Sequence, residues 1–345
     1  MKAVNSGNPK VTIAIIGVGA LGSLFASRLS SVAEVHLFGN WPEQITALQR
    51  LGLGVTEANG SDRLVRLNAT NDLSLLPLAD YVLVLVKGHQ TARAARQAAN
   101  ILRPDGLAIT LQNGLGNLVR LAEAVGTRRA AAGITAQGAE ITAPGRLHHA
   151  GTGPTYLAGT QAQVPKLQRL ADLFNLAGLE TALVRNGDSL VWGKLAVNAG
   201  INPLTALLEI PNGLLAERDQ LRFVMRAAAT EVAAVAAAQG IDLPYPDAAD
   251  RAEEVSRATA TNRSSMLQDI SRGVPTEIEA ISGEVVRIGK QLGVLTPVNQ
   301  LLLNLVKSKE ERRIADLQPL QPASQALRTN EPLRKDQRYS GQALG

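Results

Sequence analysis

Residues 11–29 read VTIAIIGVGALGSLFASRL, and this stretch decides the fold of the first part of the chain. It opens with a continuous apolar run over residues 11–16, which is typical of a strand buried on both faces. Gly17, Gly19 and Gly22 follow in the order G-x-G-x-x-G, and a helical apolar pattern comes after them. A strand, a glycine-rich turn and a helix in this order predict a dinucleotide-binding unit.

Each glycine has a physical role in such a unit. We expect Gly17 to permit the tight turn, Gly19 to let a pyrophosphate approach the backbone, and Gly22 to let helix and strand pack closely. The phosphates would then lie at the N-terminus of the helix, where unpaired N–H groups favour anions. The candidate cofactor-binding residues of the loop are Gly17, Val18, Gly19, Ala20, Leu21 and Gly22.

Further strands support this interpretation. Apolar runs at residues 33–39, 81–87 and 106–116 alternate with helical patterns, which favours an α/β fold with a mostly parallel, Rossmann-type sheet. Ligands of such sheets bind beyond the carboxyl ends of the strands, and Lys87 and Asn113 are placed there. The alternative role for both side chains is to cap a loop.

The end of the second strand normally reveals the nucleotide preference. An acid there binds the ribose of NAD, whereas an arginine nearby favours the 2′-phosphate of NADP. This chain has Gly39 and Asn40, which are neither, so Asn40 is a candidate cofactor contact that leaves the choice open.

Strand signals stop after about Val184, and helical patterns follow. We therefore expect a dinucleotide-binding domain at residues 10–185, an all-helical domain at residues 186–315, and a disordered tail at residues 316–345, which are rich in Gln, Pro and charge. The active site is expected in the cleft between the two domains, because cofactor sites favour such interfaces.

The segment WGKLAVNAGINPLTAL, residues 192–207, carries three polar residues in an apolar helical pattern. Lys194, Asn198 and Asn202 are spaced by four, so they form one stripe on a helix. This stripe predicts a helix face that lines a cleft. Two alternatives remain: a solvated lysine, and Asn202 as the N-cap of a second helix that starts at Pro203.

Composition excludes several other classes of protein. With 45% hydrophobic residues, 345 residues are enough for two domains and a large core. The polar start and the lack of a long apolar run predict a cytoplasmic protein without membrane contact. The chain has no cysteine, and its four histidines do not stand in ligand spacing, so we predict no metal. The net charge of +5 is scattered and aromatic content is 3%, which favours an anionic small molecule over nucleic acid as the partner.

From about Thr12 to Lys309 the chain resembles the 2-dehydropantoate 2-reductase (ketopantoate reductase) family. The resemblance rests on GVGALG, VLVLVKGHQ, LQNGLGN, WGKLAVNAGINPLTAL, PNG at residues 211–213, and NRSSMLQDISRGVPTEIEAISG. It implies NADPH-dependent reduction of 2-dehydropantoate to (R)-pantoate, on the route to pantothenate and coenzyme A. A homodimer is compatible with it.

The resemblance also implies the roles of individual residues. The general acid of the family falls on Lys194. Its substrate-binding residues fall on Asn113, Asn198, Asn202, Asn212, Asn262 and Ser265. Its cofactor contacts outside the glycine loop fall on Lys87, Asn113, Ala139 and Glu277. Many members have an arginine where this chain has Asn40, so NADP preference is in doubt and NAD stays open.

Simpler roles remain for some of these residues. Glu277 lies near the start of a predicted helix, where an acid is favourable to the helix dipole whatever its function. Either Ser264 or Asn262 could be the N-cap of the next predicted helix.

The chemistry of a ketone reduction agrees with a lysine acid. Hydride addition to a 2-oxo acid builds negative charge on oxygen, which an ammonium group stabilises and then protonates. The ordinary pKa of lysine, about 10.4, must fall for this role, and an apolar helix face at a domain boundary lowers it. Two alternative functions remain: a reductase of another branched 2-oxo acid in the same family, and a non-catalytic NAD(P) sensor.

Overall fold

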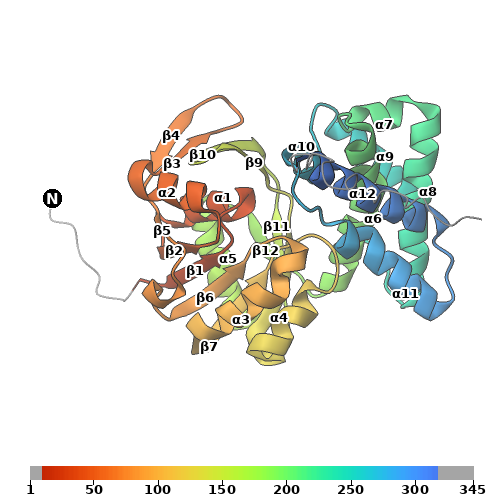
Figure 1. The fold of residues 1–345 in the computed structure, drawn as a ribbon. Coiled ribbons are helices and arrows are strands. Elements are labelled where there is room, and N and C mark those ends of the chain that lie inside the picture. The colour runs from red at the N-terminus through yellow and green to blue at the C-terminus, as the bar shows by residue number, and fades with distance from the viewer. Residues whose placement is uncertain (1–9, 318–345) are drawn as a thin grey trace, which may run out of the picture.

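The structure is a computed structural model that describes residues 10–317, with side chains to residue 312. A body built on a sheet lies beside a body built of helices, and the chain passes once from the first to the second (Figure 1). The predicted tail lies outside the described residues, except that residues 316 and 317 belong to the last helix.

The first body contains an eight-stranded sheet in the order β12-β11-β8-β7-β6-β1-β2-β5. Neighbouring strands pair in parallel except β8 and β11, which confirms the mostly parallel sheet. Its strands are β1 (Thr12–Ile16), β2 (Glu34–Phe38), β5 (Asn68–Thr70), β6 (Ala79–Val84), β7 (Leu102–Thr110), β8 (Ala130–Thr135), β11 (Thr155–Ala158) and β12 (Thr181–Leu183).

Helices pack against this sheet, and β1 shows why its sequence is continuously apolar. Ile13 and Ile15 belong to one core cluster, whereas Ala14 and Ile16 belong to another. Both faces of the strand are therefore covered, as expected of a parallel sheet. The helices of this body are α1 (Ala20–Leu29), α2 (Pro42–Leu51), α3 (Thr91–Ile101), α4 (Asn117–Val125) and α5 (Val164–Leu176).

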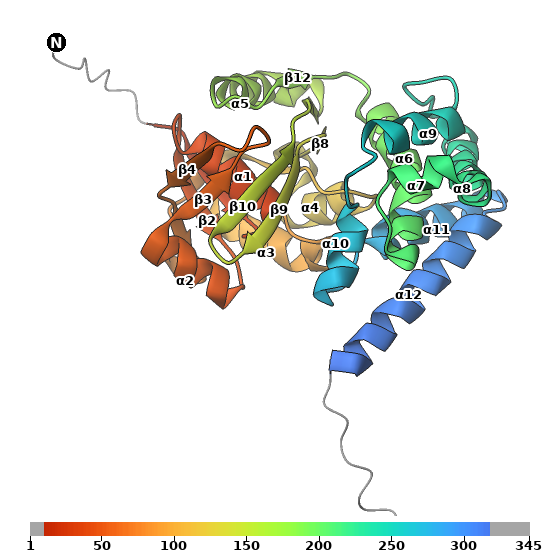
Figure 2. The same ribbon diagram turned by 90° about the horizontal axis from the view of Figure 1, so that it is seen from above.

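A second sheet of four strands was not predicted. Its order is β4-β3-β10-β9, with β3 and β10 parallel and the other pairs antiparallel. Strands β9 and β10 lie beside α1 (Figure 2), so this sheet covers the glycine-loop side of the first body. The strands are β3 (Leu53–Thr56), β4 (Asp62–Val65), β9 (Gly138–Ala143) and β10 (Arg146–Gly151).

The second body is helical, as predicted, around a core that includes Trp192, Met225 and Val306. A π-helical turn at Glu279–Gly283 leads directly into α11. None of the helices within residues 10–317 is long and apolar enough to cross a membrane. The helices are α6 (Gly187–Leu208), α7 (Gly213–Glu217), α8 (Asp219–Ala238), α9 (Ala248–Ala258), α10 (Ser265–Arg272), α11 (Glu284–Leu292) and α12 (Pro297–Leu317).

Helix α6 is longer than the sequence indicated. It continues through Pro203, so the alternative in which Asn202 caps a second helix is wrong. Proline is tolerated here in a helix whose C-terminal half is buried, and the Thr205 hydroxyl donates to the carbonyls of Ile201 and Asn202. Lys194, Asn198 and Asn202 thus share one helix, as the spacing predicted.

Candidate active site

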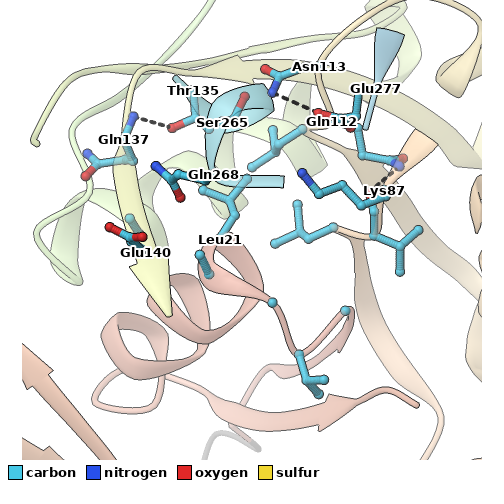
Figure 3. Close-up of a pocket in the computed structure, with 18 of the residues that line it drawn as sticks. Leu21, Lys87, Gln112, Asn113, Thr135, Gln137, Glu140, Ser265, Gln268 and Glu277 are labelled. Carbon is cyan, nitrogen blue, oxygen red and sulfur yellow. Dashed lines mark hydrogen bonds between the residues drawn. The ribbon is translucent and has the colours of Figure 1, made fainter. Parts of the chain in front are cut away.

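A cavity of about 890 Å³ is lined by both bodies. The carboxyl ends of β1, β6 and β7 contribute Gly17, Lys87 and Asn113, and the helical body contributes Lys194 and Ser265. Figure 3 shows Lys87, Asn113, Ser265 and Glu277 around this space. The position agrees with the expectation of a site in the cleft between the two domains.

The glycine loop has the steric properties that its motif predicts. Gly17 has a φ of +129°, and a Cβ there would lie 2.5 Å from the carbonyl oxygen of Leu85. A Cβ on Gly22 would lie 1.8 Å from the carbonyl oxygen of Gly17, so this glycine lets α1 pack against the turn. A Cβ on Gly19 would meet nothing within 4 Å, which leaves the backbone open to the cavity.

Residues 17–21 of the loop line the cavity, and Gly22 does not. Gly19 is the N-cap of α1 and offers no side-chain cap, so the first N–H groups of that helix are left for another acceptor. An anion is favoured at such a helix end, both by these donors and by the helix dipole.

Lys87 and Asn113 each reach across to the helical body instead of capping their own loops. The ammonium of Lys87 pairs with Asp269 of α10, with Nζ 2.6 Å from Oδ2. The Asn113 amide donates to Glu277 Oε2 at 3.2 Å (Figure 3). Both contacts join the two bodies at the edge of the cavity.

Lys194 projects from α6 toward the end of β8, where its Nζ donates to the carbonyl oxygen of Thr135 at 2.8 Å. Burial lowers the pKa of Lys194 to about 8, and the negative charge of Glu277 opposes that fall. The lysine is therefore a cation that releases its proton near physiological pH. Glu277 is buried within the cavity wall, so its position is more specific than the general helix-dipole role allows.

The adjacent serines have different positions. Ser264 is the N-cap of α10: its Oγ accepts from the Leu267 N–H at 3.1 Å and lies 2.7 Å from the hydroxyl oxygen of Thr205. Ser265 lines the cavity instead. The remaining expected residues found in the wall are Asn40, Ala139 and Asn262.

Three expected substrate residues are not among those that line the cavity within the described residues. Asn198 is half-buried and Asn202 is buried, one and two turns beyond Lys194 on α6. Asn212 is buried, and its amide donates to the Thr259 hydroxyl at 2.9 Å. Asn212 thus packs within the helical body, and the substrate roles of all three stay predictions.

Several residues that line the cavity were not predicted from the sequence. Gln90, Arg93 and Gln97 recur at three and four residues around the start of α3, a spacing that was open to recognition. Gln137 lies just before β9 and His148 lies in β10, and neither residue was assigned a role from the sequence. No group of three acidic or histidine residues within the described part of the chain is arranged to hold a metal ion.

Comparisons with known proteins agree with this architecture. Residues 13–161 match the family model described as ketopantoate reductase PanE/ApbA, and residues 187–310 match the model of its C-terminal part. A 2-dehydropantoate 2-reductase of Halobacterium salinarum is 37% identical over 298 residues, which cover 86% of this chain and 97% of that protein.

Solved structures give the same result. A PanE/ApbA family ketopantoate reductase from Ralstonia eutropha has a TM-score of 0.81 at 31% identity, covering 88% of this chain and all of that one. D-mandelate dehydrogenase, solved with NADH and anilino(oxo)acetate, has a TM-score of 0.84 at 26% identity and covers the same shares. From its two domains, its glycine loop and these matches, the chain belongs to the ketopantoate reductase PanE/ApbA family.

Proposed function

We propose that the protein reduces 2-dehydropantoate to pantoate with a nicotinamide dinucleotide, and that Lys194 is the general acid. The observation that carries the proposal is the position of Lys194: a half-buried ammonium with a pKa of about 8, in the same cavity as the glycine loop. The 2-dehydropantoate 2-reductase of Halobacterium salinarum, similar over 97% of its length, supports the choice of substrate.

The residues present fit a dinucleotide. The open backbone at Gly19 and the uncapped start of α1 offer N–H donors to a pyrophosphate. The cavity continues from Asn40, at the end of β2, to Lys194, so one elongated ligand can contact both. When bound, the dinucleotide supplies the hydride.

Lys194 supplies the proton. As negative charge develops on the ketone oxygen, its ammonium stabilises that charge and donates one proton to the oxygen. The π bond of the ketone is thereby replaced by a C–H bond, from the hydride, and an O–H bond, from the proton, and the C–O single bond remains. Afterwards the neutral amine recovers a proton from solvent, which a pKa near 8 makes favourable at neutral pH.

Neighbouring groups position this lysine and the substrate. The Thr135 carbonyl accepts from Lys194, which fixes the direction of the side chain. Glu277 favours the charged form of Lys194 and accepts from the Asn113 amide. The hydroxyl of Ser265 and the amide of Asn262 offer donors and acceptors for the carboxylate and hydroxyl of the substrate.

For the cofactor we propose NADPH, with weaker discrimination against NADH than in relatives that carry arginine at position 40. Asn40 lines the cavity and can hydrogen-bond a phosphate oxygen, but it cannot neutralise the charge. The variant Asn40→Arg should then improve the affinity for NADPH selectively. A wild-type preference for NADPH above roughly a thousandfold, about 4 kcal/mol, would be too large for this account.

A second candidate is a 2-oxo acid other than 2-dehydropantoate. D-mandelate dehydrogenase, whose structure contains NADH and anilino(oxo)acetate, is as similar in fold as the ketopantoate reductase of Ralstonia eutropha. The same lysine and cavity serve either reaction, because the chemistry at the ketone is identical.

The test is a panel of 2-oxo acids, assayed with NADPH and with NADH by the loss of nicotinamide absorbance. Turnover that is highest with 2-dehydropantoate supports the proposal, and turnover that is highest with another 2-oxo acid supports the second candidate. Dinucleotide binding without turnover of any member of the panel would refute both and favour a sensor.

A further inference from the structure

Five cations line the cavity: Lys87, Arg93, Lys194, Arg263 and Arg272. A ligand with several phosphates needs positive charge, and the end of β2, where the adenosine ribose lies in this fold, has only the neutral Asn40. A phosphate bound at that end therefore needs its positive charge from one of these five side chains.

Two of the cations are paired with one carboxylate. Lys87 Nζ lies 2.6 Å from Oδ2 of Asp269, and an Arg272 guanidinium nitrogen lies 3.0 Å from Oδ1. Asp269 is only 1% exposed, so it has little water to replace these partners. Both side chains are therefore held at α10, where the single carboxylate of Asp269 offsets one of their two positive charges.

Two others are held elsewhere. Lys194 donates to the Thr135 carbonyl at the substrate end. Arg263 donates to the Ser271 hydroxyl at 2.5 Å, beside α10. Neither side chain belongs to the β2 side of the cavity.

Arg93 is the exception. It is exposed, and no hydrogen bond or ion pair to it occurs within the part of the chain that the structure describes. An arginine side chain offers five N–H donors and a positive charge. Arg93 thus enters the cavity as an unneutralised cation.

Arg93 also lines the same cavity as the residues that follow β2. It lies in the first turn of α3, and the next residue, Ala94, belongs to the same buried cluster as Phe38, the last residue of β2. Gly39 and Asn40 follow Phe38 directly and line the cavity together with Arg93 and Ala94. A ligand that fills this cavity can therefore contact both the start of α3 and the end of β2.

We infer that Arg93 binds the 2′-phosphate of NADPH and replaces in part the arginine that this chain lacks at position 40. The inference rests on the proposed dinucleotide site. A guanidinium pairs two N–H donors with two phosphate oxygens, which a neutral amide at position 40 cannot do. Asn40 then contributes one hydrogen bond beside that pair.

The experiment measures binding of adenosine fragments by calorimetry to the full-length protein, without turnover. The probes are adenosine 2′,5′-bisphosphate and adenosine 5′-monophosphate, which differ only in the 2′-phosphate. The variants are Arg93→Ala and its matched control Arg96→Ala, an exposed arginine on the same helix that does not line the cavity. Both variants lose the same charge, so the general attraction for anions falls equally.

We expect wild type and Arg96→Ala to bind the bisphosphate about tenfold or more tightly than the monophosphate. In Arg93→Ala that ratio should fall to about threefold or less, with the same monophosphate affinity as in Arg96→Ala. Equal ratios in the two variants, or a wild type without preference for the 2′-phosphate, would overturn the role of Arg93 while leaving the reductase proposal intact. A wild type that binds neither probe would instead refute the dinucleotide site itself.

Discussion

Replacement of Lys194 by methionine should make the protein more stable while abolishing its activity. Methionine keeps the length of the side chain but removes the charge. Because burial lowers the pKa of Lys194 from 10.5 to about 8, its charged form is less stable in the folded state than in the unfolded state. At about 1.4 kcal/mol for each pH unit, the wild-type protein loses about 3 kcal/mol of stability at pH 7.

Part of this gain is offset. The variant also loses the hydrogen bond to the Thr135 carbonyl, which costs about 1–2 kcal/mol. The attraction of Glu277 is already included in the lowered pKa of Lys194. We therefore expect a net gain of about 1–2 kcal/mol at pH 7. The cost in wild type is full below pH 8 and disappears between pH 8 and 10.5, where the folded protein releases the proton first.

Guanidinium unfolding of both proteins near pH 7 and near pH 10 measures this difference. In parallel, kcat/KM should fall by about a thousandfold or more, and NADPH affinity should change little. A Lys194→Met protein that is less stable than wild type at pH 7 by more than ~1 kcal/mol would refute the electrostatic account. Turnover within about tenfold of wild type would refute the general acid.

Further predictions concern pH and the residues around the lysine. In wild type, kcat for reduction should fall as pH rises above about 8, because Lys194 must be protonated in that direction. The kcat for alcohol oxidation should rise over the same range, because Lys194 must then be neutral. A flat pH profile up to pH 10 would contradict this prediction. On their predicted substrate role, Asn198→Ala and Asn202→Ala should raise the substrate KM more than they lower kcat, because an amide that binds substrate contacts the ground state and the transition state alike. Steady-state kinetics that show only a loss of kcat would contradict this role. Ser264→Ala should cost about 1 kcal/mol in denaturant unfolding through loss of the α10 N-cap, with little change in KM. Ser265→Ala should do the reverse, and matching effects in the two variants would remove the distinction between them.

The dinucleotide half of the site was predictable because its determinants are local. The spacing of Gly17, Gly19 and Gly22 reports a turn whose sterics depend on a few adjacent residues, and the structure has these contacts. The stripe of Lys194, Asn198 and Asn202 was predictable for the same reason, since helical spacing alone places the three on one face.

The missing parts depend on distant contacts. The influence of Glu277 on the pKa of Lys194 joins residues far apart in the sequence, and neither residue's identity indicates that the other is its neighbour. Pro203 misled the interpretation because a local rule ends helices at proline, whereas buried packing around the C-terminal half of α6 outweighs that rule here. The cap role of Ser264 and the cavity role of Ser265 were not separable without coordinates.

The second sheet has a consequence for the order in which a growing chain folds. Strand β3 pairs with β10, so Gly54 cannot form its hydrogen bonds in this strand pair until the segment around Arg146 has been synthesised. By then the ribosome has already synthesised the elements around the glycine loop, which are β1, α1, β2 and β6. Because Ala139 and His148 form one wall of the cavity, a nascent chain that stops before them offers phosphate donors on an open surface. The wall that the second sheet contributes is therefore complete only after about residue 151 has emerged, and the wall from the helical body only after Glu277 has followed.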